Sequence, residues 1–91
     1  MRTDMARRQV AQIEAAIADL DQTARALEHE IEIEHKRTGI RDPGHIAYSM
    51  YAKATIVRRD NLKRSITDLK ECLASAKISL AEVSHDVQNR E

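Results

Sequence analysis

Apolar residues recur at alternating steps of three and four through the first third of the chain. Two apolar positions in each seven residues lie on one face of an α-helix, and this repeat is typical of a coiled coil. In heptad notation Val10 takes position a and Ile13 takes position d, and Glu34 interrupts the repeat at a later d position. The repeat predicts a helix over about residues 3–37. Its apolar members are Val10, Ile13, Ile17, Leu20, Ala24, Leu27 and Ile31.

A second heptad repeat fills the last third of the chain. It also alternates steps of four and three, and no alternating strand pattern of comparable length competes with it. The repeat predicts a second helix over about residues 45–88. Its apolar members are Leu62, Ile66, Leu69, Leu73, Ala76, Leu80, Val83 and Val87.

The stretch between the repeats, KRTGIRDPGHIAYSMYAKA at residues 36–54, holds both glycines, the proline and both tyrosines of the chain. Gly39 suits the left-handed position that ends a helix. Asp42 followed by Pro43 suits the start of a new helix, and Ser49 is a second candidate for its N-cap. The stretch therefore predicts a turn over about residues 38–44, with the second helix beginning after Asp42 or after Ser49.

Two long helices joined by a short turn pack side by side in opposite directions. The expected fold is all-α: one antiparallel two-helix coiled-coil hairpin spanning residues 1–91. The apolar positions align when paired residue numbers add to about 83, which places Ile17 opposite Ile66 and Val10 opposite Leu73. In this register Val83 and Val87 extend past the first helix. Since small single cores are marginal, either a homodimer of hairpins, which would form a four-helix bundle, or a complex with a larger partner is expected.

Composition narrows the classes of function. Charged residues make up 33% of the chain, aromatic residues 2%, and the net charge is zero, which argues against general nucleic-acid or membrane binding. The single Cys72 makes no internal disulfide and suits a reducing compartment. No apolar run reaches the length of a membrane span or resembles a signal segment. The expected location is the cytoplasm.

Several residues invite a chemical interpretation. Glu32 with His35, and Glu82 with His85, match the Glu-x-x-His spacing of di-iron bundles. These pairs occupy outward heptad positions near opposite ends of the hairpin, which favours a solvated charged face. Cys72, at a g position, lacks an adjacent base and is interpreted as a thiol flanking the core. No catalytic, cofactor or metal site is expected, and the chain is expected not to be an enzyme.

The remaining candidates are contacts with partner proteins. Arg58 and Arg59 belong to a basic run interleaved with acidic residues, which favours a protein-facing or solvated surface. Tyr48 and Tyr51 flank the turn, where they either pack the tip of the hairpin or contact a partner, because tyrosine is enriched at interfaces. Candidate contacts are Tyr48, Tyr51, Arg58, Arg59, Leu80, Val83 and Val87.

Three segments together resemble the alphaproteobacterial branch of the FliJ family of flagellar export proteins. They are RRQVAQIEAAIADLD at residues 7–21, GIRDPGHIAYSMYAKA at 39–54 and RRDNLKRS at 58–65. The most distinctive part is the turn, from Asp42-Pro43 to Tyr51-Ala52-Lys53-Ala54. The resemblance implies a short version of the family fold, without the usual N- and C-terminal extensions.

The resemblance also implies a function. Members of that family are cytoplasmic antiparallel coiled coils that work with the flagellar type III export ATPase and the export gate. By resemblance, the chain is expected to be a non-enzymatic adaptor or chaperone located peripherally at the flagellar export apparatus. The alternative, from a different class, is a self-associating structural coiled coil with no export role.

Overall fold

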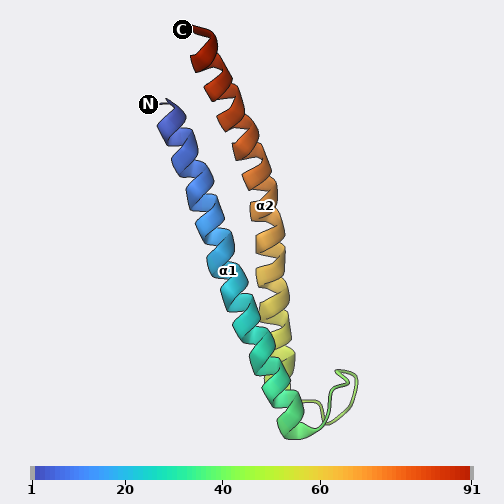
Figure 1. Ribbon diagram of the computed structural model, residues 1–91. Helices are drawn as coiled ribbons and strands as arrows, with labels where there is room; N and C mark the ends of the chain where they lie inside the picture. Colours follow the sequence, from blue (N-terminus) through green and yellow to red (C-terminus); the bar gives the residue numbers. More distant parts are fainter. Residues whose placement is uncertain (1, 91) are drawn as a thin grey trace.

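The computed structural model describes the backbone of residues 2–90 and the side chains of residues 2–88. It contains two long helices, α1 (Arg2–Thr38) and α2 (Met50–Arg90). The helices lie side by side in opposite directions, so both ends of the chain lie at one end of the molecule (Figure 1). The expected all-α helical hairpin is confirmed.

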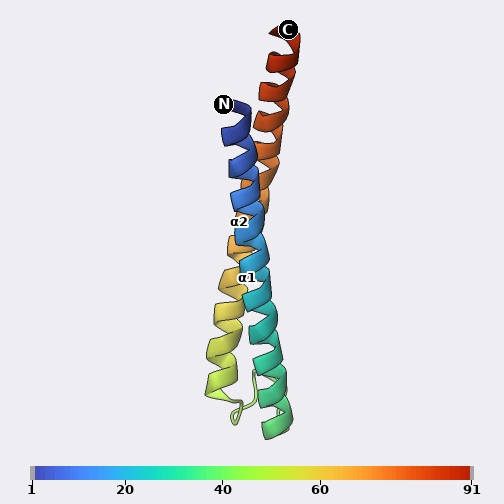
Figure 2. The ribbon, with the colours of Figure 1, turned by 60° about the vertical axis from the view of Figure 1, so that its left-hand side comes forward.

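The hairpin is long and thin. Its principal extents are 68 × 18 × 13 Å. In the view turned by 60°, one helix crosses in front of the other (Figure 2). The C-terminal end of α2 projects beyond the start of α1 in both views. A loop of residues 39–49 joins the helices at the opposite end, which we call the tip.

Helix α1 ends as the sequence predicts. Gly39 has a φ of 74°, in the left-handed region, and its amide donates a hydrogen bond of 2.8 Å to the carbonyl oxygen of His35. The side chain of Thr38 then accepts a hydrogen bond of 3.2 Å from the amide of Ile40. The glycine allows the chain to leave the helix without a steric penalty at this position.

Helix α2 begins at Met50, five residues later than the predicted start near residue 45. Of the two candidate N-caps, Ser49 takes the role: its hydroxyl accepts a hydrogen bond of 3.1 Å from the amide of Ala52. The Asp42 carboxylate instead accepts one of 2.9 Å from the amide of Gly44. This local turn uses the side chain that would have capped a helix. The connection is therefore residues 39–49 and not 38–44.

The core is a narrow strip between the helices, and it is unequally buried. We call residues 24–63 the tip half and residues 2–23 with 64–88 the open half. Six side chains of the tip half are buried, and only three of the open half. Those of the tip half are Ala24, Leu27, Ile31, Tyr48, Ala52 and Thr55; those of the open half are Val10, Ile66 and Ala76. Of the other apolar seam residues of the open half, Val87 is exposed, and seven are half-buried: Ile13, Ile17, Leu20, Leu69, Leu73, Leu80 and Val83.

Candidate protein-interaction surfaces

Tyr48 is part of the packing at the tip. Its side chain is 7% exposed, and its hydroxyl shares a hydrogen bond of 2.6 Å with Nε2 of His35 on the last turn of α1. The two rings meet edge to face, with centroids 5.5 Å apart. Of the two roles predicted for this tyrosine, the structure supports packing, because the ring offers almost no surface to a partner.

Tyr51 lies differently, on the surface of the first turn of α2. Its side chain is 53% exposed, and its hydroxyl donates a hydrogen bond of 2.9 Å to the Glu30 carboxylate on α1. This hydrogen bond to a carboxylate raises the pKa of Tyr51 above its ordinary value of 10.0. The ring also lines a shallow pocket of about 280 Å³ together with Ile33. Tyr51 is thus the tyrosine that remains accessible to a partner.

Other apolar side chains are exposed at the same end of the molecule. Ile46 is fully exposed, Met50 is 77% exposed and Ile33 is 53% exposed. We call these three residues and Tyr51 the tip surface. Sequence reasoning did not propose Ile46 or Met50 as contacts. A signal was present, because they lie outside the heptad repeats and have no position in the seam.

Two acidic residues of α1 near the tip form ion pairs with arginines. The Arg41 guanidinium donates two hydrogen bonds, of 2.9 and 2.7 Å, to the two carboxylate oxygens of Glu32. This contact lowers the pKa of Glu32 and raises that of Arg41. A hydrogen bond from Arg37 likewise lowers the pKa of Glu34. The contact between Arg41 and Glu32 holds the loop against the last turns of α1.

The Glu-x-x-His pairs do not form a common site. Glu32 is bound to Arg41 and His35 to Tyr48, whereas Glu82 and His85 lie on α2 near its far end (Figure 1). Among the residues whose side chains the structure describes, no three His, Cys, Asp or Glu side chains come together as metal ligands. Glu82 and His85 are exposed, as expected of a charged surface, but His35 is half-buried and packs against Tyr48, so the interpretation as a solvated face is wrong for His35.

The basic run on α2 is partly neutralised by carboxylates. Lys63 forms an ion pair of 2.9 Å with Glu28 across the two helices, and Arg59 forms one of 3.0 Å with its neighbour Asp60. Arg59 is half-buried and Arg58 is exposed. Of the two arginines predicted as partner contacts, Arg58 therefore offers its charge more directly to another molecule.

The end of α2 also keeps apolar side chains in contact with solvent. Leu80 and Val83 are half-buried, and Val87 is 47% exposed. Figure 1 shows the reason: α1 starts at a level that leaves the last turns of α2 without a facing helix. The predicted overhang is present.

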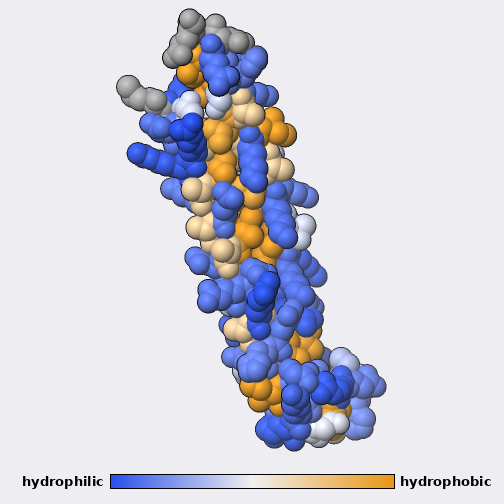
Figure 3. All heavy atoms as spheres, viewed as in Figure 1, coloured by the Kyte–Doolittle hydropathy of each residue, from blue (hydrophilic) through white to orange (hydrophobic). Residues whose placement is uncertain are grey.

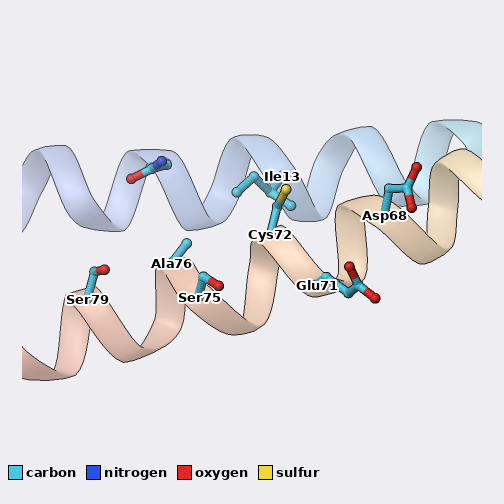
Figure 4. Close-up of a pocket in the computed structure, with 8 residues that line it drawn as sticks. Ile13, Asp68, Glu71, Cys72, Ser75, Ala76 and Ser79 are labelled. Atoms are coloured by element: carbon cyan, nitrogen blue, oxygen red, sulfur yellow. The ribbon is translucent and has the colours of Figure 1, made fainter.

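A groove runs between the helices in the open half. It has a volume of about 560 Å³. Cys72 reaches from α2 toward Ile13 on α1, and Ala76 points across in the same direction (Figure 4). Cys72 is a free thiol and is exposed. Hydrophobic residues also form a visible stripe between the helices in this half of the molecule (Figure 3). The groove is lined by Gln9, Ile13, Asp68, Glu71, Cys72, Ser75, Ala76 and Ser79.

Comparison with known proteins gives no relative. No family model matches the chain, and no curated protein or solved structure is matched by it. Within residues 2–90, neither helix contains an apolar stretch long enough to cross a membrane.

Proposed function

We propose that the chain is a non-enzymatic adaptor of flagellar type III protein export, acting with the export ATPase and the export gate. The three segments quoted above supply the resemblance on which this proposal rests. The antiparallel hairpin is the fold that the resemblance implies. In this role the chain would act at the cytoplasmic face of the export apparatus, through contacts between proteins.

The tip surface is the observation that gives the proposal a mechanism. A hairpin of this shape presents few concave sites, so a partner is best engaged by exposed apolar side chains at its end. Met50 and Tyr51 begin α2, directly after the Ser49 cap, so their backbone is fixed before a partner binds. Side chains on an ordered element lose less conformational entropy on binding than those on a mobile loop.

The first test is genetic. Deleting the coding sequence in the source organism should abolish swimming and the secretion of flagellar subunits, and the intact sequence should restore both. A deletion strain that swims and secretes normally would contradict the export role. In parallel, the purified chain should bind the purified export ATPase or the cytoplasmic domain of the gate, as measured by calorimetry.

The tip surface has its own test. The double variant Met50→Ser with Tyr51→Ala should remain helical and lose partner binding. Ile78→Ser is the matched control, since Ile78 is an apolar residue of α2 that is 61% exposed and lies away from the tip. If the control and the double variant bind equally well, the tip surface is not the contact.

A self-associating structural coiled coil is the second candidate function. The half-buried apolar seam of the open half favours it, because a second layer of helices would cover these side chains. In that case the deletion strain would swim normally and the purified chain would be a stable oligomer without any other protein.

A further inference from the structure

The two flanks of the open half differ in their chemistry. On one flank the e positions from residue 14 to 28 carry acidic residues on α1, and those from residue 63 to 77 carry lysines on α2. The ion pair between Glu28 and Lys63 lies where this flank enters the tip half. On the other flank, which contains Cys72, the g positions from residue 9 to 23 and from residue 65 to 79 carry no charge, and charged g residues, Arg2 and Asp86, follow only at its outer end. The charged flank consists of Glu14, Asp21, Glu28, Lys63, Lys70 and Lys77; the Cys72 flank consists of Gln9, Ala16, Thr23, Ser65, Cys72 and Ser79.

The groove of about 560 Å³ opens on the Cys72 flank, since Gln9, Cys72 and Ser79 all line it. Positions d and g are neighbours around a helix, so half-buried d residues such as Ile13 and Leu69 border the same flank. Burying the short side chains of this flank requires the desolvation of no charge at these g positions. Asp68 and Glu71 are the two carboxylates that line the groove, whereas six charged side chains line the opposite flank, so another helix displaces fewer charges from water on the Cys72 flank.

The chain is long and thin, and its exposed area exceeds that of a compact monomer of the same mass. The solvent-accessible surface is 6891 Å², whereas the scaling of area with mass for folded monomers gives about 5,400 Å² for 10.3 kDa. The excess of about 1,500 Å² compares with about 800 Å² that each partner buries in a stable interface. One further copy of the hairpin, covering one flank with an interface of that size, would remove about half of this excess.

We propose that a second copy of this chain packs on the Cys72 flank, with the two hairpins antiparallel and a twofold axis passing beside Cys72. The product is a four-helix bundle in which the half-buried seam residues of the open half become core. Cys72 is the middle of the three g residues of α2 on this flank, so an isologous contact centred on the flank brings the two thiols together.

Charge complementarity supports the antiparallel arrangement. Arg58 and Asp86 are the next g residues of α2 beyond the Cys72 flank, and each is fourteen residues from Cys72, or about 21 Å along the helix. Both side chains are exposed. A twofold axis at Cys72 places each Arg58 opposite Asp86 of the second copy, which gives two attractive pairs, one at each end of the contact.

A parallel arrangement, with both tips at the same end, is disfavoured by two aspartates. Ile13 lines the groove with residues 68–76 of α2, so Asp19 lies within about two turns of the level of Asp68. Both are c residues bordering the Cys72 flank, and both are exposed. Parallel packing would set α1 against α2 of the second copy and bring these carboxylates toward each other. Antiparallel packing instead sets Asp68 near Ser75, which is uncharged.

Light scattering and thiol oxidation of the full chain test this proposal together. The expected result is a dimer at micromolar concentration that forms a Cys72–Cys72 disulfide under mild oxidation, since a twofold contact at this residue permits the short Cα separation that a disulfide needs. The matched control is Cys72→Ser with Ala74→Cys, because Ala74 is exposed on the side of α2 away from the flank. A monomer, or cross-linking that is as fast at position 74 as at position 72, overturns the proposal.

A variant without oxidation gives an independent readout. Cys72→Arg places two like charges at the axis and should produce a helical monomer, whereas Ala74→Arg should remain a dimer. Arg58→Glu should raise the dissociation constant about tenfold, and adding Asp86→Arg should restore it. A dimer that tolerates Cys72→Arg, or a charge swap without recovery, contradicts the antiparallel contact. Neither outcome depends on the export role, because no other protein is present.

Discussion

The tip half and the open half are built from the same heptad repeat, yet the tip half buries more of its seam, with Leu62 as its half-buried exception. Ala52 is 0% exposed, Thr55 2% and Ala24 3%. In the open half, the apolar residues Ile17, Leu20 and Leu73 occupy equivalent positions and are only half-buried. The heptad pattern thus determines which face turns inward, and a further factor determines how completely that face is covered.

Two features close the tip half. Small side chains at Ala24 and Ala52 have little surface to hide, so one neighbouring helix is enough to cover them. The loop then adds a third element, because Tyr48 packs its ring on His35 at the end of α1. In the open half, larger side chains meet one helix on their inner side and solvent on the other. Small residues and a covering segment therefore favour burial between two helices, although Ile66 in the open half is 8% exposed without either.

The largest change in the free energy of unfolding is expected from a leucine truncation in the tip half, compared with a matched truncation in the open half. Leu27→Ala, in the tip half, removes a side chain that is 4% exposed and should lower the free energy of unfolding by about 3 kcal/mol. Leu80→Ala, in the open half, removes one that is half-buried and should cost about 1 kcal/mol. Urea denaturation followed by circular dichroism measures both.

Protein concentration must be fixed in that experiment, since any self-association adds to the apparent stability. At concentrations where the chain is a monomer, equal costs for the two leucines would show that burial in the single hairpin does not separate the halves. A larger cost for Leu80→Ala at high concentration would instead report a contact that covers the open half.

The sequence predicted the helices, their orientation and the overhang because these follow from periodicity and from the position of the turn. It did not predict where α2 begins. Asp42 and Ser49 are both good caps, and the choice between them depends on contacts distant in sequence, such as that of Tyr48 with His35. The heptad repeat also did not predict the unequal burial of the two halves, because leucine, alanine and threonine all fit the same heptad positions.

A smaller change in the free energy of unfolding is expected from a substitution at Gly39, where the chain leaves α1. Gly39→Ala should lower the free energy of unfolding by about 1 kcal/mol, because Gly39 has a positive φ that other residues adopt at a cost. Nothing lies within 4 Å of where the new methyl group would be, so this cost is one of backbone conformation alone. Thermal unfolding followed by circular dichroism measures it.

Gly44→Ala is the control for that variant. Gly44 does not have a positive φ, and a methyl group there would meet the Asp42 carboxylate oxygen at 3.3 Å, which a small rotation of that exposed side chain relieves. Its cost should be clearly lower. If both alanine variants are equally stable, the end of α1 does not depend on the left-handed glycine.

The two tyrosines provide a comparison in which only a hydroxyl changes. Tyr48→Phe removes the partner of His35 inside the tip and should cost about 1 kcal/mol, because the His35 nitrogen loses its hydrogen bond in a part-buried place. Tyr51→Phe removes an exposed hydrogen bond to Glu30, which water replaces, so its effect should be close to zero. Equal effects in chemical denaturation would mean that the interior of the tip is as well hydrated as its surface.

The two tyrosines also show how much of the candidate site could be predicted from the sequence. Aromatic residues beside a turn indicated the tip as a place of interest, and the structure retains that location. The sequence did not distinguish the two, because burial of Tyr48 depends on its position just before the Ser49 cap, where the chain still lies against α1. Tyr51, inside the helix, is carried to the surface by the helical geometry.

The smallest expected effect is on the titration of Tyr51. Its hydrogen bond to the Glu30 carboxylate raises its pKa above 10.0, so Glu30→Gln should lower that pKa. Ultraviolet absorbance in a Tyr48→Phe background isolates Tyr51, because these are the two tyrosines of the chain and it has no tryptophan. Since the folded pKa is the higher one, any stabilisation from this exposed contact is small, is present below pH 10 and is lost as the pH rises through the folded pKa. An unchanged titration in Glu30→Gln would show that the hydroxyl does not remain on Glu30 in solution, and would leave the Tyr51 hydroxyl available to a partner.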